Sequence, residues 1–207
     1  MNDGNPIKFL PSDAATVQSI SVTNDSWGGP PLQGVTANFT TASGTSFDVM
    51  VPRDGHSYSV VPSSEVQSGD YYTFGASDTN VATGQAIGTT QTATNASAVT
   101  LTMPPPMAYS APVPSAFPNF TISYSGFPGH TYTASISWEV FTITITATAS
   151  FQNGATTLAI PDLSSLSGFY APATSGTEII WSTSLSSGTT SSGSSSGVQN
   201  SGTYVVP

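Results

Sequence analysis

The sequence predicts an all-β protein built as two antiparallel β-sandwich domains in series. Three observations carry this prediction: apolar residues recur with a period of two along short segments, turn-forming residues separate those segments, and a proline-rich stretch divides the chain. The clearest period is VFTITITATASF, residues 140–151, where Phe141, Ile143 and Ile145 alternate with threonines. Helix has little support, and residues 12–18 and 160–169 are its best short candidates.

Further strands are expected along both halves of the chain. The first half offers 17–23, 34–41, 46–52, 57–62, 70–77 and 98–104, and the second offers 119–126, 130–138, 156–161, 177–185 and 202–207. Between them lie GGPP, RDGH, FPGH and QNGA, which supply the glycine, proline, asparagine and aspartate that tight reversals need. Many short strands with frequent turns are typical of β-sandwiches.

Changes in composition predict where the domains begin and end. Residues 1–13 are expected to form a flexible leader, 14–103 the first sandwich, and 117–207 the second. The segment between them, 104–116, is predicted to be a linker, because prolines cannot donate to a central strand ladder. The Ser/Gly-rich residues 186–197 are expected to form a hairpin loop that returns to a last strand in GTYVVP.

Composition excludes several classes of partner. The chain has 2 Lys+Arg against 11 Asp+Glu and a formal net charge of -9, so no basic patch can neutralise the phosphates of nucleic acid. The absence of cysteine removes disulfides, thiolate metal sites and cysteine nucleophiles. No apolar run approaches the roughly 18 residues of a membrane span.

The abundance of serine and threonine is typical of exported β-rich proteins. No signal peptide is visible in MNDGNPIKFLPSD. Because the composition indicates export, we expect a secreted or cell-surface protein, in particular a bacterial lipoprotein. Its signal peptide would then have been removed.

The first half also carries a family pattern. The run PLQGVTANFTTASGTSFDVMVPRDGHSYSVVP places Leu32, Gly34 and Val35 in a first strand, Gly44 in a turn, Val51 and Pro52 at a strand end, and Gly55, Tyr58 and Val60 at the next strand. In this, residues 17–103 resemble the carboxypeptidase regulatory-like or transthyretin-like β-sandwich, of the Ig-like or prealbumin-like type. The resemblance implies a non-catalytic module attached to secreted or surface proteins. One extra residue, His56, departs from the pattern.

Two histidines stand in one repeated frame, Gly-His-Ser/Thr-Tyr-Ser/Thr, at His56 and His130. One interpretation is a site that uses these histidines. The other is that the frame marks how a strand begins, with the glycine in the turn and the tyrosine packed against the sheet. We favour the second, because no His-x-His or His-x3-His spacing supplies further metal ligands.

Neither the acidic residues nor the serines form a pattern typical of an active site. The carboxylates are scattered singly, and no Gly-x-Ser-x-Gly elbow precedes a helical pattern, so we predict that the chain is not an enzyme. Calcium is the cofactor to consider, because Asp70, Asp78 and Asn80 lie near turns and offer hard oxygen ligands. The alternative is that these residues only form Asx turns.

The predicted function is therefore binding or structural assembly without catalysis, at the cell surface and with a glycan or a protein as partner. A carbohydrate-binding module is the first alternative, and Trp27, Tyr71 and Tyr72 are the loop aromatics that would stack on sugars. A calcium-stabilised adhesin or a filament subunit is the second. In that case unpaired edge strands would let copies assemble.

Overall fold

A computed structural model describes residues 16–23, 34–52, 56–80, 84–122, 129–167, 173–189 and 194–207. Within these ranges the chain forms fourteen strands and one helix of four residues. The predicted all-β fold is confirmed. The described residues include no helix that is long and apolar enough to cross a membrane.

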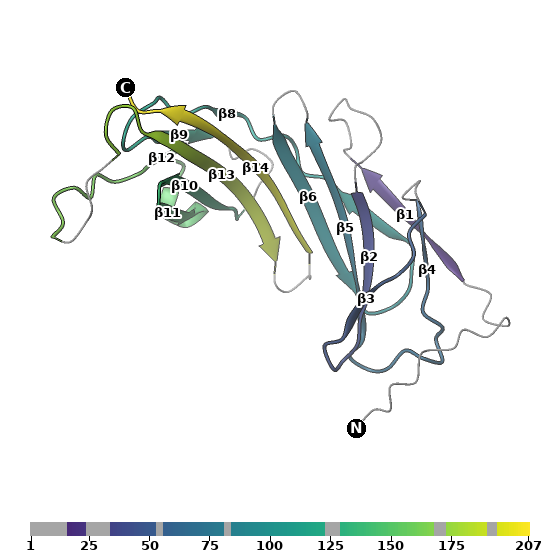
Figure 1. The fold of residues 1–207 in the computed structure, drawn as a ribbon. Helices are drawn as coiled ribbons and strands as arrows, with labels where there is room; N and C mark the ends of the chain where they lie inside the picture. Colours follow the sequence, from purple (N-terminus) through teal and green to yellow (C-terminus); the bar gives the residue numbers. More distant parts are fainter. Residues whose placement is uncertain are drawn as a thin grey trace.

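One eight-stranded sheet runs through the molecule (Figure 1). Seven neighbouring pairs hold it together, and all of them are antiparallel. From one border to the other its strands are β11 (Phe141–Thr148), β10 (Thr131–Trp138), β13 (Glu178–Thr189), β14 (Ser194–Val205), β6 (Gln85–Ala93), β5 (Tyr71–Asn80), β2 (Gly34–Thr40) and β3 (Ser46–Asp48).

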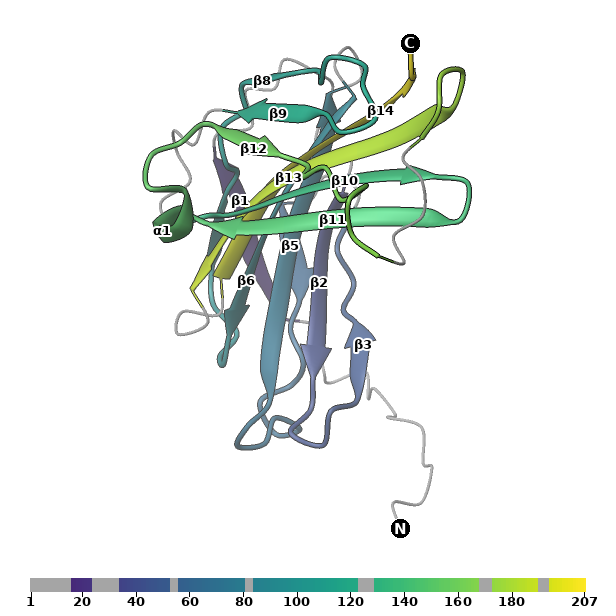
Figure 2. The same ribbon diagram turned by 90° about the vertical axis from the view of Figure 1, so that its left-hand side faces the viewer.

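Two three-stranded sheets cover the inner face of this long sheet, one in each half of the chain (Figure 2). In the first, Tyr58 places its ring 4.8 Å from that of Phe74 in β5. In the second, the Phe120 ring lies 6.1 Å from the indole of Trp181 in β13. The first sheet consists of β4 (Ser57–Ser59), β1 (Val17–Thr23) and β7 (Val99–Thr102), and the second of β12 (Thr157–Ala159), β9 (Asn119–Ile122) and β8 (Tyr109–Ser110).

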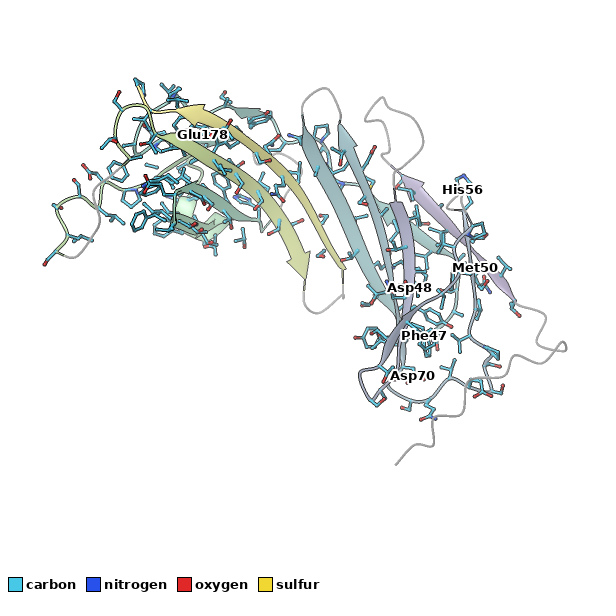
Figure 3. All side chains as sticks on the ribbon, viewed as in Figure 1. Phe47, Asp48, Met50, His56, Asp70 and Glu178 are labelled. Carbon is cyan, nitrogen blue, oxygen red and sulfur yellow. The ribbon has the colours of Figure 1, made fainter. Side chains whose placement is uncertain are left out.

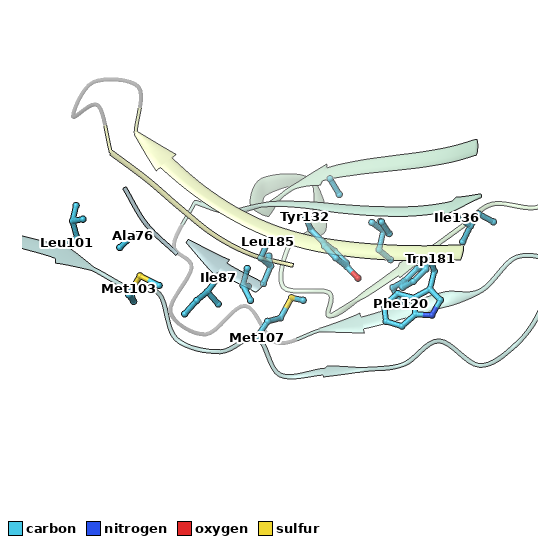
Figure 4. Packing of buried hydrophobic residues seen from close by; sticks show 14 of the residues in the cluster. Ala76, Ile87, Leu101, Met103, Met107, Phe120, Tyr132, Ile136, Trp181 and Leu185 are labelled. Carbon is cyan, nitrogen blue, oxygen red and sulfur yellow. The ribbon is translucent and has the colours of Figure 1, made fainter. Parts of the chain in front are cut away.

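The two halves meet where β14 pairs with β6. Six residues of β14 are in register with β6, from Ser194 opposite Gln91 to Gln199 opposite Ala86. The buried core also passes this junction, where Ile87, Met107 and Leu185 belong to one cluster (Figure 4). A backbone ladder and a shared core therefore join the halves, in addition to the connecting segment 104–116.

That proline-rich segment is held against the sheets rather than exposed along its length. Met107 is 3% exposed, and its backbone forms two hydrogen bonds with the side chain of Gln85. Further on, Tyr109–Ser110 forms β8, which pairs with β9. The Tyr204 hydroxyl donates to the Ser115 carbonyl at 2.7 Å. The segment is thus anchored at three places along its course.

The structure differs from the sequence prediction at two kinds of position. The predicted loop 186–197 is largely strand, because Ser186 pairs with Gly197 and the β13–β14 ladder continues to Thr189 opposite Ser194. The predicted helix at 160–169 is absent from its described part, 160–167. The other helix candidate, 12–18, lies outside the described residues except at 16–18, where β1 begins at Val17.

The helix that does form, α1 (Ala149–Gln152), ends the predicted strand 140–151 early. Thr148 caps it, because its side-chain oxygen accepts a hydrogen bond from the Phe151 N–H at 3.3 Å. Asn153 ends it in the left-handed conformation, at φ 46. Over these four residues the caps at Thr148 and Asn153 favour a helical turn, although the period of two predicted a strand.

Buried tyrosines predict how stability depends on alkaline pH. Burial raises the pKa of Tyr204 to about 12 from 10.0, and burial also raises the pKa of Tyr58 and of Tyr72. Between pH 10.0 and about 12 the tyrosines of the unfolded chain release protons that those of the folded chain retain. The contribution of the buried tyrosines to stability should therefore be fully present below pH 10.0 and be lost as the pH rises towards 12. Urea titrations across this range measure the slope.

The Tyr204→Phe variant is the control for this prediction. Phenylalanine cannot ionise. The free energy of unfolding of this variant should therefore fall less steeply over the same pH range than that of the natural chain. Equal slopes for the two proteins would contradict the assignment to Tyr204.

Candidate functional site

The three predicted aromatic ligands separate in the structure. Trp27 lies outside the described residues. Tyr71 and Tyr72 are neighbours on β5 and therefore point to opposite faces of the sheet. Tyr72 is 1% exposed, and its hydroxyl accepts a hydrogen bond from the Val61 N–H at 3.1 Å. Tyr71 is 37% exposed and is the member of this pair that solvent reaches.

The three residues considered for calcium do not converge. The Asp70 carboxylate is buried and accepts hydrogen bonds from the Ala42 and Gln67 N–H groups, both at 2.7 Å (Figure 3). Asp78 accepts one from the Thr79 N–H at 2.7 Å. Asp70 precedes β5, whereas Asp78 and Asn80 lie at its far end, about 26 Å away at the rise of a strand. One ion cannot bind both aspartates.

More broadly, the described residues contain no group of three or more His, Asp or Glu side chains that could hold a metal ion.

Both histidines stand where a strand begins. His56 precedes β4, and its carbonyl accepts the Ile20 N–H at 2.8 Å. His130 precedes β10 and is buried, with its Nε2 3.1 Å from Oε1 of Gln152 in α1. The tyrosines of the two frames, Tyr58 and Tyr132, are both fully buried. The repeated frame thus begins a strand in each half, at the border of a three-stranded sheet for β4 and inside the eight-stranded sheet for β10.

Two carboxylates line one groove at the end of the β10–β11 hairpin. Glu139 and Glu178 flank it together with Trp138 and Ile180, and its volume is about 480 Å³. Both carboxylates are exposed to solvent.

The outer face of the eight-stranded sheet is covered by hydroxyl groups. Along each strand the residues that alternate with the buried ones are mostly serine and threonine, and antiparallel register places them side by side. Neighbouring strands join hydroxyls directly, from Ser135 to Thr144 at 3.0 Å and from Thr90 to Ser195 at 2.7 Å. The set comprises Thr36, Thr73, Ser77, Thr79, Thr90, Thr92, Thr131, Thr133, Ser135, Ser137, Thr142, Thr144, Thr146, Thr148, Ser182, Ser184, Ser186, Ser195, Ser201 and Thr203.

Charge is confined to the margins of this face in the described chain. Asp48 lies on border strand β3, and Glu178 lies at the first position of β13 (Figure 3). The neutral hydroxyl surface between them, which we call the hydroxyl face, offers both hydrogen-bond donors and acceptors.

A shallow hollow of about 260 Å³ lies in the hydroxyl face over strands β2, β5, β6 and β14. We call it the glycine hollow, because Gly34, Gly75, Gly88 and Gly197 line it. Around them stand the hydroxyls of Thr36, Ser77, Thr90 and Ser195.

Register explains why two of these positions, Gly34 and Gly75, are glycine. Thr36 is opposite Gly75, and a Cβ at Gly75 would lie 2.8 Å from the Thr36 hydroxyl oxygen. Ser77 is opposite Gly34, where the corresponding distance would be 3.1 Å. Gly88 differs, because a Cβ there would meet its nearest neighbour, the Ala76 carbonyl, at 3.5 Å. A Cβ at Gly88 would therefore enter the hollow at ordinary van der Waals distance from its walls.

Tyr71 belongs to the same face as the glycine hollow. Along β5 its side chain points to the same side as the positions of Thr73 and Gly75. Gly75, which lines the hollow, is four residues away, about 13 Å at the rise of a strand. An exposed ring beside hydroxyl groups offers a stacking surface next to hydrogen-bonding groups. Tyr71 could be predicted from the sequence, but the hollow was not predicted. Its signal in the sequence is glycine within strands, which marks a close approach of the backbone.

Comparison with known proteins adds little to this geometry. No family model matches the chain, and no curated protein matches it. Among solved structures, it is similar to a two-domain fibronectin type-III segment from chicken tenascin, with 13% sequence identity, a TM-score of 0.31, and coverage of 86% of this chain and 86% of that chain.

Proposed function

We propose that this protein is a non-catalytic, exported surface protein that binds neutral glycans at the glycine hollow of its hydroxyl face, with Tyr71 as the stacking residue beside it. The observation that carries the proposal is the glycine hollow, a charge-free depression ringed by hydroxyls on the face that also bears Tyr71. Sugars present hydroxyls that both donate and accept, and so do serine and threonine. Their apolar ring faces stack on aromatic side chains, as Tyr71 would allow.

The remaining features of the chain fit this role. A net charge of -9 with 2 Lys+Arg disfavours acidic glycans and phosphate-bearing ligands, which need cationic partners. The resemblance of residues 17–103 to transthyretin-like modules supports a scaffold that carries no catalysis. We also propose that the chain is exported and held at the cell surface by a lipid anchor. A hydroxyl-rich chain without cysteine would meet such a ligand there.

A glycan array tests the proposal, with neutral and acidic glycans side by side. The natural chain should bind neutral glycans, and Gly88→Val should weaken that binding by at least about tenfold, because the new side chain occupies the hollow. Tyr71→Ala should also weaken it. Thr203→Val, on the same face but at the other end of β14, is the matched control and should bind as the natural chain does.

Two results would contradict the proposal: an array without any signal for the natural chain, or binding that Gly88→Val and Thr203→Val leave equally intact. Thermal unfolding should accompany the array. Valine suits a strand better than glycine, so Gly88→Val should unfold at no lower temperature than the natural chain. Gly88→Ala, which adds only the methyl group, serves as the milder second variant.

A further inference from the structure

The two borders of the eight-stranded sheet differ in how they are protected (Figure 2). The border strand β3 has three residues and carries Asp48. The other, β11, has eight residues, FTITITAT, with no charge, proline or glycine. Within the described part of the chain, β10 is the only strand that pairs with β11. Long, uncharged, β-branched edges are the ones that pair with another chain.

Register shows which backbone groups of β11 point away from β10. The Ala149 N–H donates to the His130 carbonyl at 2.9 Å, one residue beyond the ladder that pairs Thr148 with Thr131. Odd-numbered residues of β11 therefore bond to β10, since hydrogen-bonded and non-bonded pairs alternate in an antiparallel ladder. Thr142, Thr144 and Thr146 direct their N–H and C=O groups to the open side. Thr148 caps α1 instead.

The side chains of β11 also leave apolar surface open. Its inward-facing residues Phe141, Ile143 and Ile145 are only half-buried. At its two ends lie Val140, which is 88% exposed, and Phe151 on α1, which is 79% exposed. Figure 2 shows the hairpin turn at one end of β11 and α1 at the other. An added strand would cover both the inward row and these two ends.

We infer that β11 is a dimerisation edge that pairs with β11 of a second copy of this chain, antiparallel and about a two-fold axis at Thr144. Thr142 of one copy then lies opposite Thr146 of the other, and Ile143 lies opposite Ile145. This register bonds every outward N–H and C=O group of the three threonines. It also keeps threonine beside threonine on one face and isoleucine beside isoleucine on the other.

The residues at the two ends of β11 favour antiparallel pairing with a second copy. In this register Val140 lies opposite Thr148 of the second copy, next to the helix that bears Phe151, so the most exposed apolar side chain meets another one. The two Glu139 carboxylates stand about 33 Å apart, well beyond the screening length. A parallel pair would instead place them side by side, where like charges repel.

The dimer extends the hydroxyl face. Because paired residues in this register share a face, Thr142, Thr144 and Thr146 of both copies lie on the same side of one widened sheet. Two glycine hollows would then face the same surface, which raises the avidity for a repeating ligand. The dimer itself rests on β11 and not on the proposed glycan binding.

An engineered cysteine tests the register directly, because the natural chain contains none. In Thr144→Cys the two new thiols lie opposite each other at the axis, at a Cα separation of about 5.5 Å, which suits a disulfide. Mild oxidation should yield a covalent dimer in non-reducing electrophoresis. Thr203→Cys, exposed on the interior strand β14, is the matched control and should stay monomeric.

Sedimentation of the natural chain at rising concentration supplies the second measurement. It should show a monomer–dimer equilibrium, and Thr144→Lys, which opposes two ammonium groups at the axis, should raise the dissociation constant at least about tenfold. Thr203→Lys should not. A natural chain that stays monomeric with no cross-link through Thr144→Cys would overturn the inference, and so would a dimer that Thr144→Lys leaves unchanged. Should Thr144→Lys fail to fold, the cysteine variant decides.

Discussion

Replacing Phe74 by alanine is expected to lower the free energy of unfolding by about 4 kcal/mol. Phe74 is fully buried in the first half, with its ring 4.8 Å from that of Tyr58 and 5.9 Å from that of Tyr72. Truncation removes these ring contacts and leaves a cavity between the β4–β1–β7 sheet and the long sheet, because neighbouring aromatic rings cannot collapse far. Urea titration followed by circular dichroism measures the loss.

Phe151→Ala is the matched control for this prediction. The same change in side chain is made where 79% of the residue is exposed, so dilute samples should lose no more than about 0.5 kcal/mol. A loss below about 1 kcal/mol for Phe74→Ala would mean that the first half lacks the aromatic core described here.

Replacing Gln85 by alanine is expected to cost about 3 kcal/mol. The Gln85 side chain is 3% exposed and mimics a peptide group: its Nε2 donates to the Met107 carbonyl at 2.9 Å, and its Oε1 accepts the Met107 N–H at 3.2 Å. Nε2 also reaches Oδ1 of Asn200 at 3.3 Å. Without the glutamine, a buried N–H and a buried C=O on the connecting segment lose these partners, and each loss carries a desolvation penalty.

Gln199→Ala, at an exposed position of β14, removes the same side chain where it contributes little and should change stability by no more than about 0.5 kcal/mol. Equal effects of the two substitutions would contradict the role of Gln85 as the residue that fixes the proline-rich segment to the junction. Thermal unfolding of both variants under identical conditions makes the comparison.

The fold class could be read from the sequence, but the joint between the halves could not. Strand β6 was absent from the predicted strands because its inward positions include Gln85 and Gln91, so no apolar alternation marks it. Its strand character comes from pairing with β5 on one side and β14 on the other. Such pairing depends on residues far along the chain, which a local period cannot reveal.

The same reason explains the extended β13–β14 hairpin. Residues 186–197 contain too few apolar groups to predict order, yet β13 and β14 satisfy each other's backbone groups through Thr189 opposite Ser194. Ladder hydrogen bonds supply here what side-chain burial does not. Composition alone therefore favoured a loop.

The residues of the candidate site could be recognised in the sequence, but their arrangement in space could not. The threonine row of β11 was visible as a period of two, whereas the alignment of such rows across eight strands follows from register. Strand alternation could have separated Tyr71 from Tyr72, since adjacent residues of a strand point to opposite faces. The glycine hollow needed the cross-strand pairing of Thr36 with Gly75, which lie far apart in sequence.

One sheet, and hence one hydroxyl face, runs through both halves, and nuclear Overhauser contacts across the junction measure this directly. We expect contacts between Ile87 and Val198 and between Thr90 and Ser195, which are paired residues of β6 and β14. We also expect slow amide exchange along this ladder. Contacts of β14 to β13 alone, with none to β6, would show that the halves are separate sheets and would contradict this architecture.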